Sequence, residues 1–190
     1  MHKYFFVFIV SVSLLSGCME EKQSINLPAD TTKEDLIPDI EDYNKCDATN
    51  AVNVFTGAVS MAGKKAPELI VQIVGRISSF ASCMNAKGAS EIGYYDVHTN
   101  QNDELVVNFA AVGIGDSREV TDLKNLAICG GSALSPLSIA AQERACKEEF
   151  TIKSPDNEFI IVIVGVHDAN GDNSCDVVKE AILKKARSLE

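Results

Sequence analysis

Hydrophobic residues recur every three to four positions in two stretches of the first half of the chain, a pattern that predicts two helices. The first helix is expected over residues 48–62, with Asp47 as its N-cap. The second runs from Pro67, with apolar residues spaced by three and four, and stops at Gly88. Because the connection between them is short, we expect an αα-hairpin.

Two β-hairpins are predicted further along the chain. The first joins strands at 92–98 and 105–112, where apolar and other residues alternate. The second joins strands at 150–153 and 159–166 through a turn that contains Pro155. The run 159–166 is apolar at every position, so we expect it to be central in the sheet and covered on both faces.

Three more helices are predicted, at 117–126, from Ser135 to about residue 149, and at 174–188. The resulting order is α-α-β-β-α-α-β-β-α. It predicts an α+β fold in which an antiparallel sheet of about four strands is packed with helices and an αα-hairpin comes first.

The first residues have the layout of a secretory leader, so we expect a signal peptide there. A basic start is followed by a largely apolar region of 12 residues, Tyr4 to Leu15, which is short for a membrane span of about 20 residues. Leu15-Ser16-Gly17-Cys18 then resembles the lipobox of bacterial lipoproteins. This resemblance, which covers residues 1–18, implies cleavage before Cys18, modification of its thiol with diacylglycerol, acylation of the new amino terminus with a fatty acid such as palmitate, and attachment to a membrane. Met19 stands where an Asp retains such proteins in the inner membrane, so the outer membrane facing the periplasm is favoured over the inner membrane.

The segment after the leader is polar and acidic, contains Pro28 and Pro38, and has no sustained apolar period. We therefore predict a signal peptide at 1–17, a flexible acidic tether at 18–44 and a single α+β domain at 45–190. The short apolar cluster at 36–40 is an exception within the tether, with two alternatives: it docks on the domain or on a partner.

The chain is acidic, with 17 Lys and Arg against 27 Asp and Glu. The leader contains one of the lysines, so the mature net charge is 16 − 27 = −11. Such a charge argues against binding to nucleic acid and against electrostatic binding to anionic lipids. The membrane contact is therefore expected to come from the N-terminal lipid alone.

The cysteines that remain after lipidation are disulfide candidates, because a secreted chain meets an oxidising compartment. In the predicted helical hairpin, two of them lie equally far from the turn, which makes Cys46–Cys83 the first expected bridge. The second bridge is either Cys146–Cys175 or Cys129–Cys146, and one thiol stays free. The candidates are Cys46, Cys83, Cys129, Cys146 and Cys175.

An acidic loop before the last predicted helix is the candidate metal site, with calcium as the only cofactor indicated. Oxygen side chains occur at every second position, as calcium requires, and the loop resembles an EF-hand or dockerin loop. It departs from that pattern at Asn173 and Lys179, where a glycine and an acid are expected. The alternative is a turn with Ser174 as the N-cap of the helix. The candidate ligands are Asp168, Asn170, Asp172, Ser174 and Asp176.

The mature sequence carries no recognisable catalytic motif. Its two histidines, His98 and His167, lie at predicted strand ends, where they could meet at one edge of the sheet. No Gly-x-Ser-x-Gly, His-Glu-x-x-His or phosphate-binding glycine loop occurs. We therefore predict a non-enzymatic envelope lipoprotein that acts as an interaction or assembly module with an envelope protein partner. The alternatives are a periplasmic protein that binds calcium or a small ligand, and an inhibitor or immunity-type protein.

Overall fold

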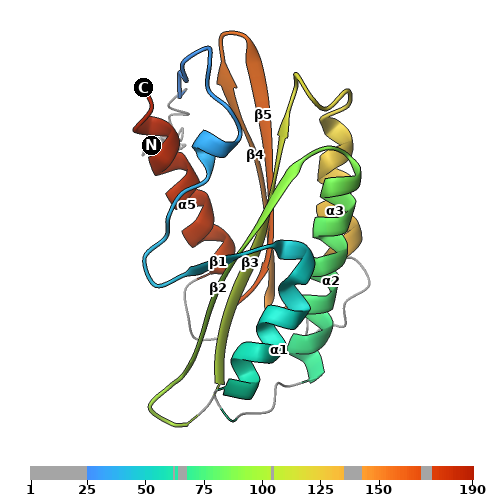
Figure 1. Cartoon of the computed structure of the whole chain (residues 1–190), viewed down its shortest axis with the longest axis vertical. Helices are drawn as coiled ribbons and strands as arrows, with labels where there is room; N and C mark the ends of the chain where they lie inside the picture. Colours follow the sequence, from blue (N-terminus) through green and yellow to red (C-terminus); the bar gives the residue numbers. More distant parts are fainter. Residues whose placement is uncertain (1–24, 62, 64–67, 104, 135–142, 168–172) are drawn as a thin grey trace, which may run out of the picture.

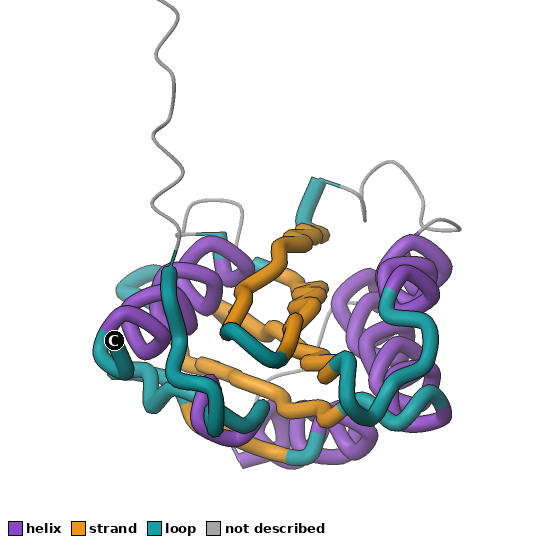
Figure 2. Tube along the Cα trace, turned by 90° about the horizontal axis from the view of Figure 1, so that it is seen from above, coloured by secondary structure: helices purple, strands orange, loops and turns teal. Residues whose placement is uncertain are grey.

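The computed structural model describes residues 25–61, 63, 68–103, 105–134, 143–167 and 173–190. A five-stranded antiparallel sheet with the order β1-β2-β3-β5-β4 lies between helices on its two faces (Figures 1 and 2). The predicted α+β class is confirmed. The strands are β1 Asn44–Cys46, β2 Ser90–Thr99, β3 Leu105–Asp116, β4 Ala145–Ser154 and β5 Asn157–Val166. The helices are α1 Ala51–Met61, α2 Glu68–Ala86, α3 Lys124–Leu134 and α5 Ser174–Arg187, with short 3-10 helices η1 Glu34–Leu36 and η2 Ala48–Asn50.

The two hairpins of the sheet occur where they were predicted. β5 has a strand on each side and is buried along nearly its whole length, in agreement with its continuous apolar run. β3 is longer than predicted because Gly113 and Gly115 belong to the strand. A Cβ atom at either position would clash with side chains of Met84 or Leu126, so these glycines allow helices to pack closely on the sheet.

The sheet buries a separate hydrophobic core on each face. On one face, α1, α2 and α3 cover apolar residues of β3 and β5, including Phe109 and Val162. On the other face, α5 and the segment before β1 cover the oppositely directed residues of the same strands, including Val112 and Ile161. The alternation of side chains along each strand therefore supplies both cores.

Residues 25–43 pack on the domain, so the predicted tether is wrong for this part of the chain. Leu27 and Leu36 are 2% and 0% exposed, and the hydroxyl of Tyr94 donates a hydrogen bond of 2.9 Å to the carbonyl of Pro38. Docking of the cluster at 36–40 on the domain is the alternative that the structure bears out. Its apolar residues are too few to form a periodic pattern, but each meets a matching surface on the sheet or on α5.

The first two helices follow the prediction closely. Asp47 accepts a hydrogen bond of 2.9 Å from the backbone N–H of Thr49 and so caps η2, which leads into α1. α2 packs on α1 and ends near Gly88, whose φ of +78° suits a glycine after a helix.

Two other helix predictions are wrong in the described residues. Residues 145–149 belong to strand β4, because pairing with β5 outweighs the helix preference of a sequence rich in Ala, Lys and Glu. Residues 135–142 lie outside the described part of the chain. The helix expected at 117–126 occurs instead at 124–134 and continues through Gly130, which lies close to Lys147 and Val162 of the sheet. In the described ranges, none of the helices has the length and hydrophobicity to cross a membrane.

Candidate functional site

A groove lies where α5, β4 and the start of the described chain meet. It encloses about 890 Å³, a volume in the range of ligand sites, and is lined mostly by apolar atoms. We call it the β4–α5 groove. Its apolar lining comes from Ile25, Leu27, Phe150, Ile152 and Leu183.

The alternation of side chains along β4 forms one wall of the β4–α5 groove. Phe150 and Ile152 point to the α5 face of the sheet, where Ile152 is buried and Phe150 is half-buried. Leu183 of α5 lies across from them and is also half-buried. Strand and helix periodicity thus bring three apolar side chains to one concave surface.

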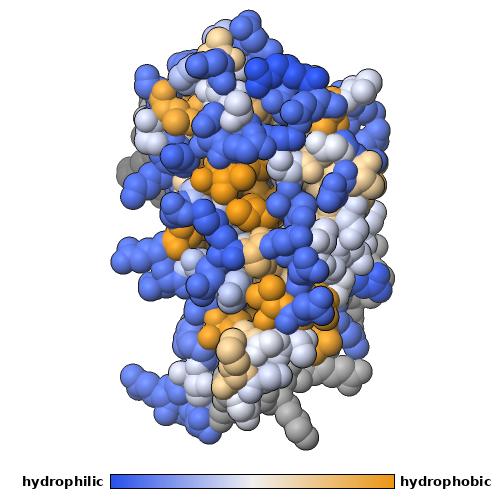
Figure 3. Space-filling model, viewed as in Figure 1, coloured by the Kyte–Doolittle hydropathy of each residue, from blue (hydrophilic) through white to orange (hydrophobic). Residues whose placement is uncertain are grey.

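Ion pairs surround this apolar lining. Lys179 of α5 donates a hydrogen bond of 2.8 Å to Glu148 of β4, and this bond raises the pKa of Lys179. Lys153 and Glu158 form a second ion pair at 3.4 Å. The face of the molecule in Figure 3 is mostly polar, with separate apolar patches between the polar side chains. An apolar recess with a polar rim is typical of a binding surface.

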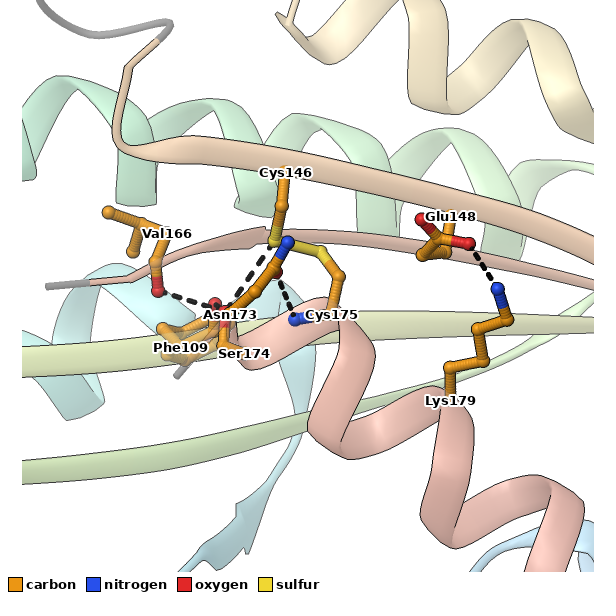
Figure 4. Close-up of a disulfide and its surroundings, with 8 residues drawn as sticks. All are labelled: Phe109, Cys146, Glu148, Val166, Asn173, Ser174, Cys175 and Lys179. Atoms are coloured by element: carbon orange, nitrogen blue, oxygen red, sulfur yellow. Dashed lines mark hydrogen bonds and ion pairs between the residues drawn. A yellow bond between two sulfur atoms is a disulfide. The ribbon is translucent and has the colours of Figure 1, made fainter. Parts of the chain in front are cut away.

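A disulfide and a buried hydroxyl hold α5 against the sheet (Figure 4). Cys146 of β4 is bonded to Cys175 in the first turn of α5, with 6.0 Å between their Cα atoms. The hydroxyl of Ser174 lies within hydrogen-bond distance of the carbonyls of Phe109 and Val166, at 3.2 and 3.1 Å. Two walls of the groove are therefore joined covalently at one end.

The N-terminal segment forms the third wall. Asn26 makes a parallel β-bridge with Lys153, and the backbone N–H of Leu27 donates to the carbonyl of Lys153 at 3.4 Å. The backbone N–H of Asn26 also donates to the carboxylate of Glu190 at 2.7 Å. These bonds fix the point at which the described chain enters the domain, directly beside the groove.

The structure gives no support to the predicted calcium site. Asp168, Asn170 and Asp172 lie outside the described residues. The hydroxyl of Ser174 is fully buried against the two backbone carbonyls described above, so it does not face a loop cation. Asp176 is exposed in the first turn of α5. No group of three or more His, Cys, Asp or Glu side chains is arranged to hold a metal within the described ranges.

The helix cap at the start of α5 also differs from the prediction. Asn173 is the N-cap, because its side chain accepts a hydrogen bond of 3.0 Å from the backbone N–H of Cys175. Ser174 is instead the first residue of the helix. A carboxamide has the same capping ability as a hydroxyl, and the neighbouring sequence does not distinguish the two.

The expected Cys46–Cys83 bridge is wrong. Cys83 of α2 is bonded to Cys129 of α3, with 5.7 Å between their Cα atoms. The prediction extended helical geometry from the helix at 48–62 back to Cys46, but Cys46 belongs to β1 and pairs in register with Gly93. Cys46 therefore belongs to the sheet, packs against the core under the helices without reaching Cys83, and is the free thiol. Of the two alternatives for the second bridge, Cys146–Cys175 is the one formed.

The free thiol is not activated for chemistry. Burial raises the pKa of Cys46 to about 11, and the nearby Asp47 and Glu91 carboxylates add to this effect. A reactive cysteine needs the opposite environment, one that stabilises the thiolate. Cys46 is therefore a half-buried structural residue.

The two histidines are not neighbours across a pair of strands. His98 is in β2 and His167 follows β5, and β3 lies between these strands. The imidazole of His98 contacts Asp96 on its own strand at 3.0 Å. The backbone N–H of His167 donates to the carbonyl of Arg144 at 3.0 Å. These contacts extend the sheet and its surface polar network.

A pair of carboxyl groups at the start of η2 was not predicted from the sequence. Glu91 of β2 accepts a hydrogen bond of 2.9 Å from the backbone N–H of Ala48 and is also hydrogen-bonded to Asp47. Burial is the largest influence on the pKa of Glu91, and with the Asp47 contact it raises the value to about 7. Since these residues are 44 positions apart, only the register of β1 and β2 could have revealed the pair.

Comparisons with known proteins do not assign the chain to a group. No protein-family model matches it, and no curated protein matches it significantly. Among the described residues, the β4–α5 groove is the feature that bears on function, and the leader stays a prediction from the sequence.

Proposed function

We propose that the protein is a lipid-anchored bacterial envelope protein whose domain binds an envelope protein partner, without catalysis, in the β4–α5 groove. The observation that carries this proposal is the position of the groove. It is apolar, it has a polar rim, and it lies beside Ile25, where the described chain begins. A lipid on Cys18 would be joined to this point through residues 19–24 only.

The character of the groove supports binding in preference to catalysis. The charged side chains at its rim, such as Lys179 and Lys153, are engaged in ion pairs with glutamates. Its lining offers hydrophobic contact area, which is the main source of binding free energy in protein association. The Cys46 thiol and the Glu91 carboxyl lie on β1 and β2, at the opposite edge of the sheet.

The membrane anchor is tested by a Cys18→Ser substitution. We expect the unaltered protein to incorporate labelled palmitate and to fractionate with membranes. The Cys18→Ser variant has no thiol to carry the diacylglycerol, so it should lose the label and either stay uncleaved or be released from the membrane. Cys46→Ser is the control, because it removes a thiol of the mature chain that is not at the cleavage site. Firm membrane retention of a cleaved Cys18→Ser chain would show that the lipid is not the anchor.

The groove is tested by placing a photocrosslinking amino acid, benzoylphenylalanine, at Lys179 of the full-length protein in its native envelope. Lys179 lines the groove, so we expect a discrete crosslinked protein on irradiation. Ile128 on α3 is the matched control, because it is 59% exposed but belongs to the other helical layer. Equal crosslinking from both positions, or none from Lys179, would remove the groove as the binding site.

A further inference from the structure

The outer edge of β4 borders the β4–α5 groove, and its backbone groups alternate in direction. In an antiparallel pair, every second residue directs its N–H and C=O toward the neighbouring strand and the residues between direct them away. The carbonyl of Arg144 accepts from the backbone N–H of His167 after β5, so even-numbered residues face β5. The carbonyl of Lys153 accepts from the backbone N–H of Leu27, so odd-numbered residues face outward.

Three residues in the middle of this edge present backbone groups for pairing. Lys147, Glu149 and Thr151 are odd-numbered and exposed. β4 is the last strand of the sheet, and no backbone hydrogen bond from another described residue reaches these three. Such an edge is a template for an added strand.

The protein itself shows that an extended chain fits against this edge. The parallel bridge between Asn26 and Lys153 places residues 25–27 beside the end of β4. The part of the edge that no other described strand or segment pairs with, residues 147–151, continues directly from that bridge. An occupant of residues 147–151 would therefore extend a pairing that already exists at Lys153.

The groove determines which side chains an added strand would carry. Residues that lie opposite each other on adjacent strands direct their side chains to the same face of the sheet. A residue opposite Phe150 would therefore point to the α5 face, toward Phe150 and Leu183 in the groove. Its immediate neighbours would point to the other face, beside Glu149 and Thr151.

We propose that the occupant of the groove is an extended segment of the partner polypeptide, which adds to β4 as an outer strand opposite residues 147–151. This inference rests on the proposed function of the groove as a protein-binding site. The segment would be about five residues, or about 17 Å, long. Apolar side chains at alternate positions would fill the groove, and backbone hydrogen bonds to β4 would supply the rest of the contact.

The experiment compares Thr151→Pro with Thr151→Ala, each in the full-length protein that carries the crosslinker at Lys179. Proline removes an N–H that points away from β5, so it deletes a bond to the added strand and leaves the β4–β5 ladder intact. Alanine removes the side chain but keeps that N–H. We expect Thr151→Pro to reduce the crosslink at least tenfold and Thr151→Ala to keep it. Both variants should melt as cooperatively as the unaltered protein.

Each other outcome overturns the inference in a distinguishable way. If both variants keep the crosslink, the partner binds the groove without pairing with β4, and the proposed function stands without this inference. If both variants lose the crosslink, the partner recognises the side chain of Thr151 and not its backbone N–H. Crosslinking to phospholipid would make an acyl chain the occupant, and a crosslinked dimer would make it a second copy. If Thr151→Pro unfolds the domain, the experiment is repeated with Glu149→Pro and Glu149→Ala. The same results are then expected for these two variants.

Discussion

At the scale of single residues, the chemistry of a side chain is decided by its neighbours in space. Ser174 has the oxygen of a calcium ligand, but its hydroxyl is directed at the carbonyls of Phe109 and Val166 and holds α5 on the sheet. Cys46 has the thiol of a nucleophile, but burial raises its pKa. Neither role could be read from the sequence, because the partners are up to 65 residues away.

The pair formed by Asp47 and Glu91 predicts a pH dependence of stability. The pKa of Glu91 is about 7 in the folded protein and 4.5 ordinarily, so folding favours the protonated carboxyl. The stability of the fold is therefore highest below pH 4.5 with respect to this group and falls as the pH rises to about 7. Glu91→Gln should remove this loss and raise the free energy of unfolding at pH 8 by about 1–2 kcal/mol, a value reduced for the partial exposure of the carboxyl.

Urea unfolding of the unaltered protein and of Glu91→Gln across this pH range measures the effect. Glu180→Gln on α5 is the control, because Glu180 is exposed and far from the pair in the fold. Parallel pH profiles for the unaltered protein and Glu91→Gln would show that the carboxyl pair does not share a proton.

At the scale of secondary-structure elements, the predictions succeeded where a periodic pattern coincided with local signals. α2 has regular apolar spacing and a glycine at its end, and β5 has an uninterrupted apolar run, so both were placed within a few residues. β4 was predicted partly as a helix because apolar and polar residues do not alternate along it: Cys146 and Ile152 are buried, but the charged Glu148 lies between them on the same face. β4 is a strand because it pairs with β5, and the sequence of β4 itself contains no pattern that indicates this pairing.

The two disulfides join different pairs of elements, so their effects on stability and on binding in the groove can be compared. Cys146–Cys175 joins β4 to α5, the two walls of the groove, and Cys83–Cys129 joins α2 to α3 in the other layer. Replacing either pair with alanines should lower the free energy of unfolding by about 2–4 kcal/mol. Only the Cys146→Ala, Cys175→Ala variant should also reduce the Lys179 crosslink, because only this bridge fixes the groove.

Thermal melting and crosslinking yield, measured on both double variants, separate the two effects. A similar loss of crosslinking from both variants would mean that the groove responds to global stability and not to this bridge.

At the scale of the whole molecule, the N-terminal segment joins α5 in the third layer of the domain. Residues 25–43 share with α5 the task of covering the second face of the sheet. The acidic composition of the segment predicted a tether, because its few apolar residues are spread over many polar ones. Polar groups of the segment also bind the domain. The guanidinium of Arg118, which is paired with Asp116, donates a hydrogen bond of 2.9 Å to the carbonyl of Thr31.

This packing predicts a large effect for a substitution in the segment. Leu36 is completely buried, so Leu36→Ala should lower the free energy of unfolding by about 2–5 kcal/mol. In a free tether the same change would have almost no effect. Glu41→Ala, an exposed position in the same segment, is the control and should stay within about 0.5 kcal/mol of the unaltered protein. Equal stability of Leu36→Ala and Glu41→Ala in urea unfolding would contradict the docked arrangement.

Docking of residues 25–43 also sets how strongly the groove has to bind. With a lipid on Cys18, the chain up to Ile25 spans at most about 25 Å. A partner anchored in the same membrane is confined with the domain to a layer of about this thickness, which raises their local concentration above that in free solution. A partner held at the same membrane would then be bound at equilibrium even if the isolated interaction has a Kd of tens of micromolar. The domain released by Cys18→Ser would keep its groove intact and still lose most of its occupancy.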